Sequence, residues 1–270
     1  MKDKVVIITG GSSGIGKALA SEFGSKGSKI LITGRKQEAL NSTVNELKGK
    51  GIDIIGFQSD VSKAEDNEAM AAEAIRQFGK IDILINNAGI TMRAPFEEVD
   101  LEVVKKVMDI NFNGVLYATK SCLSSIIENK GSVIGISSIA GYRGLPGRTG
   151  YSSSKFALNG FLEVLRTELL YKGVHVLTAC PGFTTSNIRK SSLTKDGSLQ
   201  GDSPRDEGKM MSAEECARRI YKATVKRKKI LIMTTQGIFT VWMNKFFPGL
   251  MDKMVFNVMA KEENSPFKKP

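Results

Sequence analysis

The side chains of Tyr151 and Lys155 have the types and the spacing for acid–base chemistry. They stand four residues apart, and apolar residues continue after them at steps of three and four, at Leu158, Leu162, Leu165 and Leu169. This spacing predicts a helix with one buried stripe, on which the phenol and the ammonium lie together. A free phenol has a pKa of about 10, and a neighbouring ammonium lowers it because it favours the phenolate. The pair therefore predicts a tyrosine that exchanges protons near neutral pH, tuned by the lysine.

A glycine-rich segment near the N-terminus has the chemistry for binding a pyrophosphate. The segment TGGSSGIG, residues 9–16, follows an apolar run and opens a segment with helical spacing. Gly10 permits a tight turn, Gly14 lets the backbone approach a phosphate, and Gly16 allows close packing of the helix. The helix N-terminus adds free N–H groups and positive potential, so we predict a dinucleotide site. Its spacing is GxxxGxG instead of the commoner GxGxxG.

The end of the second predicted strand favours NADP over NAD. An NAD site places a carboxylate about twenty residues after the glycine-rich turn, where it binds the ribose 2′-hydroxyl. Here the segment reads Gly34-Arg35-Lys36-Gln37 and contains no acid. A guanidinium pairs well with a 2′-phosphate, so we predict that Arg35 binds that group, helped by Lys36 and the Ser12 hydroxyl.

Short apolar runs alternate with longer segments of helical spacing along the 270 residues. The runs are rich in β-branched residues and occupy positions 5–9, 29–33, 54–58, 81–85, 132–137, 174–178 and 230–233. Because they are continuously apolar, they predict parallel strands covered by helices on both faces. Two Ser-x-x-Glu capping boxes, Ser62 to Glu65 and Ser212 to Glu215, predict helix starts. We expect an α/β chain with one Rossmann-fold domain over residues 1–270, a doubly wound parallel sheet of about seven strands.

Further motifs occur in a fixed order along the chain. They are DV at 60–61, NNAG at 86–89, NFNG at 111–114, ISS at 136–138, YSSSK at 151–155 and PG at 181–182. Together with the glycine-rich segment they resemble the motifs of the short-chain dehydrogenase/reductase family, from Lys4 to about Lys229. The region from NNAG to NFNG and the C-terminal segment resemble most the hydroxysteroid-dehydrogenase-like branch of that family.

The resemblance implies roles for the matching residues. Tyr151 is the expected catalytic acid/base, Lys155 lowers its pKa and binds the nicotinamide ribose, Ser138 hydrogen-bonds the substrate carbonyl, and Asn111 holds a water that links Lys155 to solvent. Ser186 stands where the family usually presents a threonine to the nicotinamide carboxamide. The expected cofactor-binding residues are Gly10, Ser12, Ser13, Gly14, Ile15, Gly16, Arg35, Lys36, Asp60, Val61, Asn87, Ala88, Gly89, Tyr151, Lys155, Pro181, Gly182, Thr184 and Ser186.

This set predicts an NADP(H)-dependent oxidoreductase. Ser138 polarises a carbonyl, the cofactor delivers hydride to carbon, and Tyr151 supplies the proton to oxygen. Because cells generally keep NADP reduced, we expect reduction of a bulky apolar ketone. A 3-oxoacyl group carried on an acyl carrier protein or on coenzyme A is an alternative substrate. A non-catalytic NADP-binding sensor or scaffold is the alternative of another class, although a sensor needs no proton donor.

Two segments stand apart from the regular pattern. Residues 183–211 form a long polar stretch without strand or helix spacing, which is typical of a lid or substrate-binding loop. Residues 238–260 are apolar but interrupted by Pro248 and Gly249. They are expected to cover a pocket, pack against another subunit or lie on a membrane surface. The family resemblance implies a homodimer or homotetramer, formed through helices around residues 100–127 and 150–171.

Composition narrows the remaining classes. The formal charge of +11 suggests acidic ligands, but the basic residues are scattered and no nucleic-acid recognition motif occurs, so we expect no nucleic-acid partner. Three separated cysteines and the lone His175, which we expect to be structural, predict neither a disulfide framework nor a metal site. The N-terminal apolar run is too short for a signal peptide, so a cytoplasmic protein is expected, with peripheral membrane contact through residues 238–260 left open.

Overall fold

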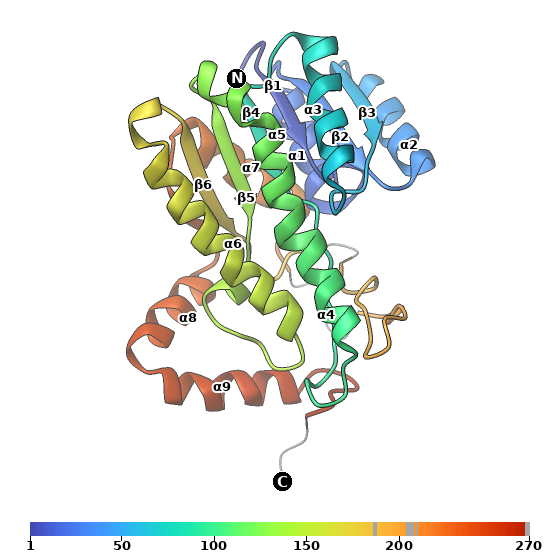
Figure 1. Ribbon diagram of the computed structural model, residues 1–270. Coiled ribbons are helices and arrows are strands. Elements are labelled where there is room, and N and C mark those ends of the chain that lie inside the picture. The colour runs from blue at the N-terminus through green and yellow to red at the C-terminus, as the bar shows by residue number, and fades with distance from the viewer. Residues whose placement is uncertain (186–187, 204–207, 209, 268–270) are drawn as a thin grey trace.

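A seven-stranded parallel sheet forms the centre of the molecule (Figure 1). The computed structural model describes residues 1–185, 188–203, 208 and 210–267. The strands are β1 Val5–Ile8, β2 Lys29–Gly34, β3 Ile54–Gln58, β4 Ile83–Asn86, β5 Ser132–Ile136, β6 His175–Cys180 and β7 Ile230–Ile232. Their order across the sheet is β3-β2-β1-β4-β5-β6-β7. The order therefore reverses between β1 and β4, and this switch point is where ligands bind in sheets of this kind.

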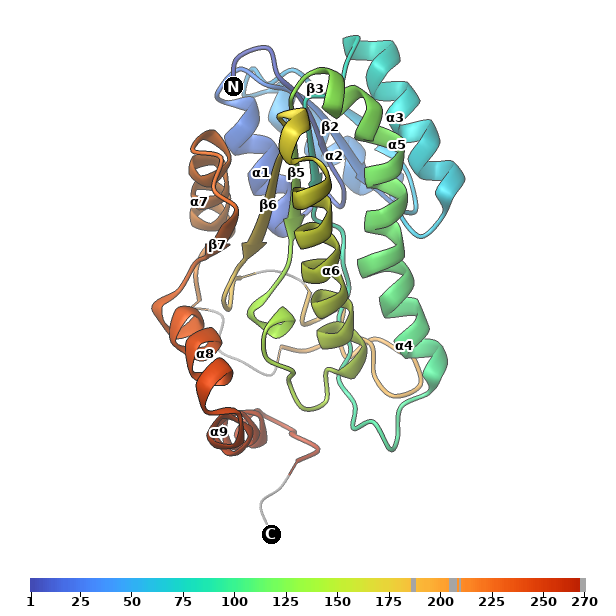
Figure 2. The same ribbon diagram turned by 60° about the vertical axis from the view of Figure 1, so that its left-hand side comes forward.

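Two layers of helices bury the two faces of the sheet (Figure 2). Helices α1 Gly14–Gly24, α2 Gln37–Lys48 and α7 Ala213–Val225 cover one face, and α3 Ala64–Phe78, α5 Gly114–Glu128 and α6 Thr149–Glu168 cover the other. Successive residues of a strand pack against opposite layers. In β1, Val6 and Ile8 pack with α1, α2 and α7, and Ile7 packs with α3, α5 and α6. Such strands have no polar face, which explains why they read as continuous apolar runs.

The elements beyond the carboxyl ends of the strands surround one end of the sheet (Figure 1). Helix α4 Leu101–Met108 continues through a π-helical turn, Asp109–Asn113, into α5. The C-terminal helices α8 Thr235–Phe246 and α9 Pro248–Ala260 lie beyond the strand ends, with α9 running across the bottom of the view. Among the described residues, no helix combines the length and apolarity needed to cross a membrane.

The predicted fold is confirmed, including the positions of all seven strands to within about two residues at each end. One capping prediction holds and the other is wrong. The Ser212 side chain accepts a hydrogen bond from the Glu215 N–H at the start of α7. Helix α3 instead has Lys63 as its N-cap, because the Ser62 hydroxyl and N–H both bind Asp60 Oδ1. His175 has the expected structural setting, since it is buried and its Nε2 lies 2.8 Å from the Lys228 carbonyl oxygen.

Candidate active site

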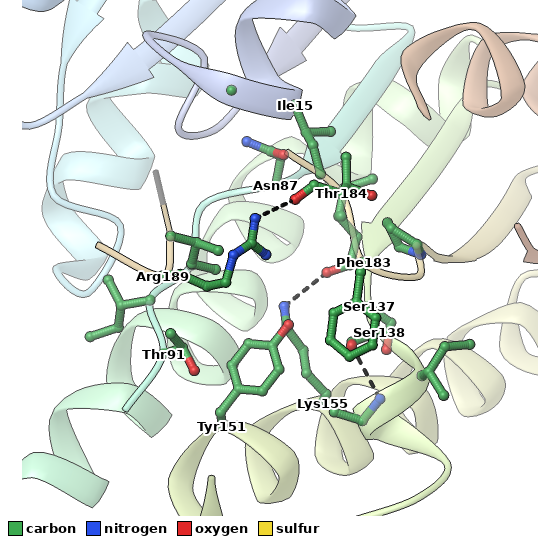
Figure 3. A pocket seen from close by; sticks show the side chains of 18 of the residues that line it. Ile15, Asn87, Thr91, Ser137, Ser138, Tyr151, Lys155, Phe183, Thr184 and Arg189 are labelled. Carbon is green, nitrogen blue, oxygen red and sulfur yellow. Dashed lines mark hydrogen bonds between the residues drawn. The ribbon is translucent and has the colours of Figure 1, made fainter. Parts of the chain in front are cut away.

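A cleft of about 1360 Å³ opens at the carboxyl ends of the strands (Figure 3). One part of the cleft is lined by the glycine-rich turn after β1 and by the ends of β2 and β4. Another part is lined by the N-terminal turns of α6, the segment after β6, and helices α8 and α9. Of the predicted site residues that the structure describes, all except Asn111 line this cleft. Ser186 lies outside the described residues.

The glycine-rich turn leaves no room for side chains at Gly10, Gly11 and Gly16. Gly10 has φ +64°, and a Cβ on it would lie 2.9 Å from the Ala88 Cα. A Cβ on Gly16 would lie 2.2 Å from the Gly10 carbonyl oxygen. Helix α1 begins at Gly14, and the side chain of its N-cap Ser13 makes no capping hydrogen bond. The first turn of α1 therefore faces the cleft with N–H groups available, the arrangement that binds a phosphate.

Asn87 ties this turn to the end of β4. Its amide nitrogen donates to the Thr9 and Gly10 carbonyl oxygens at 2.9 and 3.1 Å. The Thr9 hydroxyl in turn accepts hydrogen bonds from the N–H groups of Asn87 and Ala88, each at 3.0 Å. Asn87 thus lines the cleft while its side chain holds the cradle in shape. Thr9 was missed by the sequence reasoning, and its position next to Gly10 at the end of β1 was the available indication.

The polar side chains at the end of β2 form the predicted 2′-phosphate region. Arg35 and Lys36 are exposed and line the cleft, and a Cβ on Gly34 would lie 3.0 Å from the Ser12 Oγ. Asp60 lies nearby with Val61 at its side. Burial raises the pKa of the Asp60 carboxyl, but hydrogen bonds from Ser62 and the charge of Arg35 outweigh burial and lower it overall. Asp60 is therefore an ionised neighbour of Arg35.

Tyr151 and Lys155 lie side by side on the first turns of α6, as their spacing predicted (Figure 3). The Lys155 Nζ is 5.7 Å from the centre of the Tyr151 ring and donates to the Ile136 carbonyl oxygen at 2.8 Å. Burial lowers the pKa of Lys155 to about 8. Burial also raises the pKa of Tyr151, although interaction with Ser138 and the charges of Arg148 and Arg189 act in the opposite direction.

The expected direction of the Tyr151 shift is therefore wrong for the arrangement seen here. The sequence predicted that Lys155 lowers the pKa of the phenol, whereas burial raises it. The physical reason is that Lys155 is buried too and directs its ammonium at a backbone carbonyl. The phenol is consequently protonated at neutral pH and is suited to donate a proton.

Ser138 stands at the end of β5, close to the Tyr151 hydroxyl (Figure 3). Its Oγ accepts a hydrogen bond from the Ala140 N–H at 3.1 Å, as the cap of the short 3₁₀ helix Ile139–Gly141. This bond fixes the hydroxyl oxygen while leaving its hydrogen available as a donor. The two hydroxyls can therefore meet one oxygen atom of a bound carbonyl.

Asn111 is fully buried in the π-helical turn. Its Oδ1 accepts from the Ile90 N–H at 2.8 Å, and its Nδ2 donates to the Ile90 carbonyl and to Ser154 Oγ. A Cβ on Gly89 would lie 3.2 Å from Asn111 Oδ1 and 3.8 Å from Lys155 Nζ, so all three residues are neighbours. Asn111 fixes the chain after β4, and its role in a water relay stays a prediction.

The segment after β6 forms the remaining wall. Pro181, Gly182 and Thr184 line the cleft, and the Thr184 hydroxyl donates to the Gly182 carbonyl at 3.2 Å. Arg189 lines it too and donates to the Thr184 carbonyl at 2.9 Å (Figure 3). Neither Arg189 nor Arg148 was predicted, because no motif marks them and only the fold brings them near Tyr151.

Residues 188–203, the described middle of the long polar stretch, are held by backbone hydrogen bonds. The Leu193 N–H donates to the Thr91 carbonyl at 2.9 Å, and the Arg93 N–H donates to the Leu193 carbonyl at 2.7 Å. Leu193 itself is buried against Met92 and the residues of α4. The segment is thus anchored to the chain after β4, next to the cleft.

Comparison with known proteins finds similarity to short-chain dehydrogenases. The family model described as short chain dehydrogenase matches residues 4–197. "Dehydrogenase/reductase SDR family member 7B" of Mus musculus is 33% identical over 273 residues, covering 98% of this chain and 84% of its own. An uncharacterised oxidoreductase of Listeria monocytogenes is 38% identical over 179 residues, covering 66% of this chain and 72% of its own.

Two solved structures share the architecture. A short-chain dehydrogenase/reductase from Burkholderia phymatum, in complex with NAD, superposes with a TM-score of 0.83 at 25% identity, covering 92% of this chain and 95% of that one. An alcohol dehydrogenase from Thermococcus sibiricus, complexed with 5-hydroxy-NADP, superposes with a TM-score of 0.75 at 24% identity, covering 85% and 95%. The second likeness extends to the fold alone.

Proposed function

The chain belongs to the short-chain dehydrogenase family, and from this premise we propose that it reduces a bulky apolar ketone with NADPH as hydride donor. The observation that carries the proposal is the meeting of Tyr151, Lys155 and Ser138 beside a glycine cradle in one cleft. Burial keeps the Tyr151 phenol protonated, as a proton donor to a carbonyl oxygen must be.

The residues around the cleft fit a nicotinamide dinucleotide. The cradle is a space that a side chain on Gly10 or Gly16 would fill, at the N-terminus of α1. Arg35, Lys36 and Ser12 would hold a 2′-phosphate, since they supply two cations and a hydroxyl and segment 34–37 contains no acid. The preference for NADP over NAD rests on this group. Of the two solved structures, one is in complex with NAD and the other with 5-hydroxy-NADP.

Residues of the chain orient the carbonyl and supply the proton. When bound, the nicotinamide supplies the hydride that reduces the carbonyl carbon. Ser138 donates a hydrogen bond to the carbonyl oxygen, where negative charge develops. Tyr151 Oη gives its proton to the same oxygen, and Lys155, whose Nζ lies 5.7 Å from the centre of the Tyr151 ring, is the neighbouring cation.

The lining of the outer cleft supports an apolar substrate. Beyond the reactive hydroxyls it is formed mainly by Ile139, Leu145, Phe183, Phe239, Met251, Met254, Val255, Val258 and Met259. A hydroxysteroid-like ketone fits this chemistry, and segment 183–211 is proposed to cover it. Reduction of a 3-oxoacyl thioester is the second candidate, favoured by the net charge of +11, which attracts acidic carriers. The homo-oligomer implied by the family resemblance also remains part of this proposal.

Coenzyme binding and turnover test the proposal together. Fluorescence titration with NADPH and NADH is followed by absorbance assays on apolar ketones, aldehydes and 3-oxoacyl thioesters. We expect preferential NADPH binding and turnover of at least one compound, and a rate loss of about 10²- to 10⁴-fold in Tyr151→Phe. Tyr171→Phe is the matched control, because Tyr171 is 98% exposed and does not line the cleft.

Two results would count against this proposal. Tight NADPH binding without turnover in a broad panel would favour a sensor or scaffold. Equal activity of Tyr151→Phe and the wild type would remove Tyr151 from its role.

A further inference from the structure

Helices α8 and α9 each present an exposed apolar stripe. Ile238, Trp242 and Phe246 follow one another at steps of four on α8, and Leu250, Met254 and Val258 do so on α9. These six side chains are exposed by between 40% and 56%. Single exposed apolar residues are normal on a protein surface, but a continuous group of them marks a binding surface.

The exposed stripe of α9 is additional to the stripe that packs the helix onto the protein. Met251, Val255 and Met259, one position further along, are buried against Leu145 and Met243. A helix that only covers a core needs one such buried stripe, with polar residues on either side of it. In α9 the apolar arc continues outward through Leu250, Met254 and Val258 instead. Packing within the chain therefore does not account for the second stripe.

The exposed stripes adjoin the mouth of the cleft. Phe239 of α8, together with Met254 and Val258 of α9, lines the cleft and is also exposed, by 49%, 40% and 46% respectively. A residue that does both lies at the rim. The cleft therefore opens to the outside at residues of both helices. Helices α8 and α9 lie beyond the strand ends (Figures 1 and 2).

Two lysines give these helices a small excess of positive charge. Lys245 and Lys253 are exposed beside the stripes. The acidic residue within 235–260 is Asp252, whose Oδ1 pairs with Arg143 Nη2 at 2.5 Å. Lys245 Nζ lies 5.8 Å from the centre of the Phe246 ring, which itself contacts Trp242. Aromatic rings at the level of the headgroups and lysines reaching anionic phosphates are typical of a helix lying on a bilayer.

We infer that this surface, defined by the stripes 238/242/246 and 250/254/258, binds an anionic lipid membrane, with the cleft opening toward the acyl chains. A substrate dissolved in the bilayer then reaches Tyr151 without crossing water. This route rests on the proposed function. Lipid is favoured over a second copy of the chain because a protein seated on both stripes would cover the rim residues at the entrance. The cationic side chains add attraction for anionic headgroups.

The lone tryptophan of the chain makes the membrane contact measurable without a label. Trp242 fluorescence is recorded with vesicles of phosphatidylcholine and with vesicles that also contain phosphatidylserine. We expect a blue shift with the mixed vesicles and quenching when their acyl chains are brominated. No shift and no cosedimentation would overturn the inference. A blue shift that follows protein concentration without vesicles would overturn it in favour of a second copy.

Paired variants distinguish binding through this surface from non-specific adsorption to the vesicles. Trp242→Ser with Leu250→Ser removes side chains that do not line the cleft. The matched control is Leu170→Ser with Tyr171→Ser, since these residues are exposed by 55% and 98% just before β6, at the opposite end of the sheet. We expect the cosedimentation partition coefficient to fall about tenfold or more in the first pair and to stay unchanged in the control. Equal behaviour of the two pairs would contradict the assignment.

A charge-reversal pair tests the preference for anionic lipid. Lys245→Glu with Lys253→Glu is expected to abolish the preference for phosphatidylserine, while Lys226→Glu with Lys229→Glu, in the exposed run 226–229, is expected to keep it. Equal losses would point to the net charge of the chain instead. Vesicle binding is measured without any enzymatic reaction. A protein that does not bind vesicles therefore does not contradict the proposed reaction, and an inactive protein that binds vesicles does not contradict the membrane inference.

Discussion

Replacing Arg35 by alanine should change the coenzyme preference of the protein without changing its fold. Arg35 is exposed at the end of β2, and its side chain lines the dinucleotide part of the cleft beside Ser12 and Lys36. No described hydrogen bond of the protein uses its guanidinium; the Gln58 amide binds only its backbone carbonyl. The substitution therefore removes a positive charge from the 2′-phosphate region and leaves the packing of β2 intact.

The size of the effect follows from the exposure of the group. Two unit charges 4 Å apart attract by about 1 kcal/mol in water and by about 4 kcal/mol at the effective dielectric constant near a protein surface. Exposure and the ionised Asp60 nearby place Arg35 toward the lower part of this range. We expect a loss of about 2 kcal/mol, or roughly 30-fold in NADPH affinity. NADH lacks the 2′-phosphate, so its affinity should not change.

Fluorescence titrations of both coenzymes at several salt concentrations measure this ratio. The wild-type preference for NADPH should weaken as salt rises, because screening acts strongly on an exposed pair. Arg76→Ala is the control, since Arg76 is an exposed arginine of α3 that pairs with Glu73 away from the cleft. The reasoning is refuted if Arg35→Ala keeps the wild-type ratio of affinities, or lowers both affinities equally.

Three further predictions concern the cradle, the buried lysine and the core. Gly16→Ala should weaken coenzyme binding at least tenfold, because its Cβ would lie 2.2 Å from the Gly10 carbonyl oxygen, whereas Gly160→Ala, with no atom within 4 Å of its Cβ, should bind normally in the same titration. Burial lowers the pKa of Lys155 to about 8. Between about pH 8 and the ordinary lysine pKa, the unfolded chain therefore binds more protons than the folded one. The free energy of unfolding, from denaturant curves, should therefore rise with pH over that window by a few kcal/mol more in the wild type than in Lys155→Met; an equal rise in both would contradict this origin. Leu162→Ala should cost about 2 to 5 kcal/mol of stability, and because a Cβ on Gly135 would lie 2.4 Å from Leu162 Cδ1, Gly135→Ala should cost less in the Leu162→Ala background than alone.

The sheet was predictable because its central strands bury both faces. A strand such as β5 packs α-helices on either side, so every residue in it is buried and the run stands out from the amphipathic segments around it. The cradle was predictable for a related reason: the backbone geometry at Gly10 and Gly16 excludes side chains, so glycine recurs at fixed positions. Helix periodicity likewise placed Tyr151 and Lys155 on one buried face.

Local patterns were less reliable where a competing partner stood close by. The Ser62 capping box failed because the hydroxyl binds Asp60, two residues away, and the helix begins without it. The pattern at Ser212 met no such competitor, and its predicted bond to Glu215 is present. Sequence spacing identifies the candidates for a cap, and the neighbouring acceptors decide between them.

The sequence by itself determined the fold class, the cradle and the spacing of the tyrosine–lysine pair, since each depends on backbone geometry or on short-range periodicity. The tertiary structure decided what depends on burial and on residues far apart in the chain. It raised the pKa of Tyr151, placed Arg148 and Arg189 close enough to act on that pKa, and gave Asn111 its partners Ile90 and Ser154. It also left the outer stripes of α8 and α9 exposed at the rim of the cleft. Desolvation and long-range contacts are properties of the packed molecule, so no local pattern encodes them.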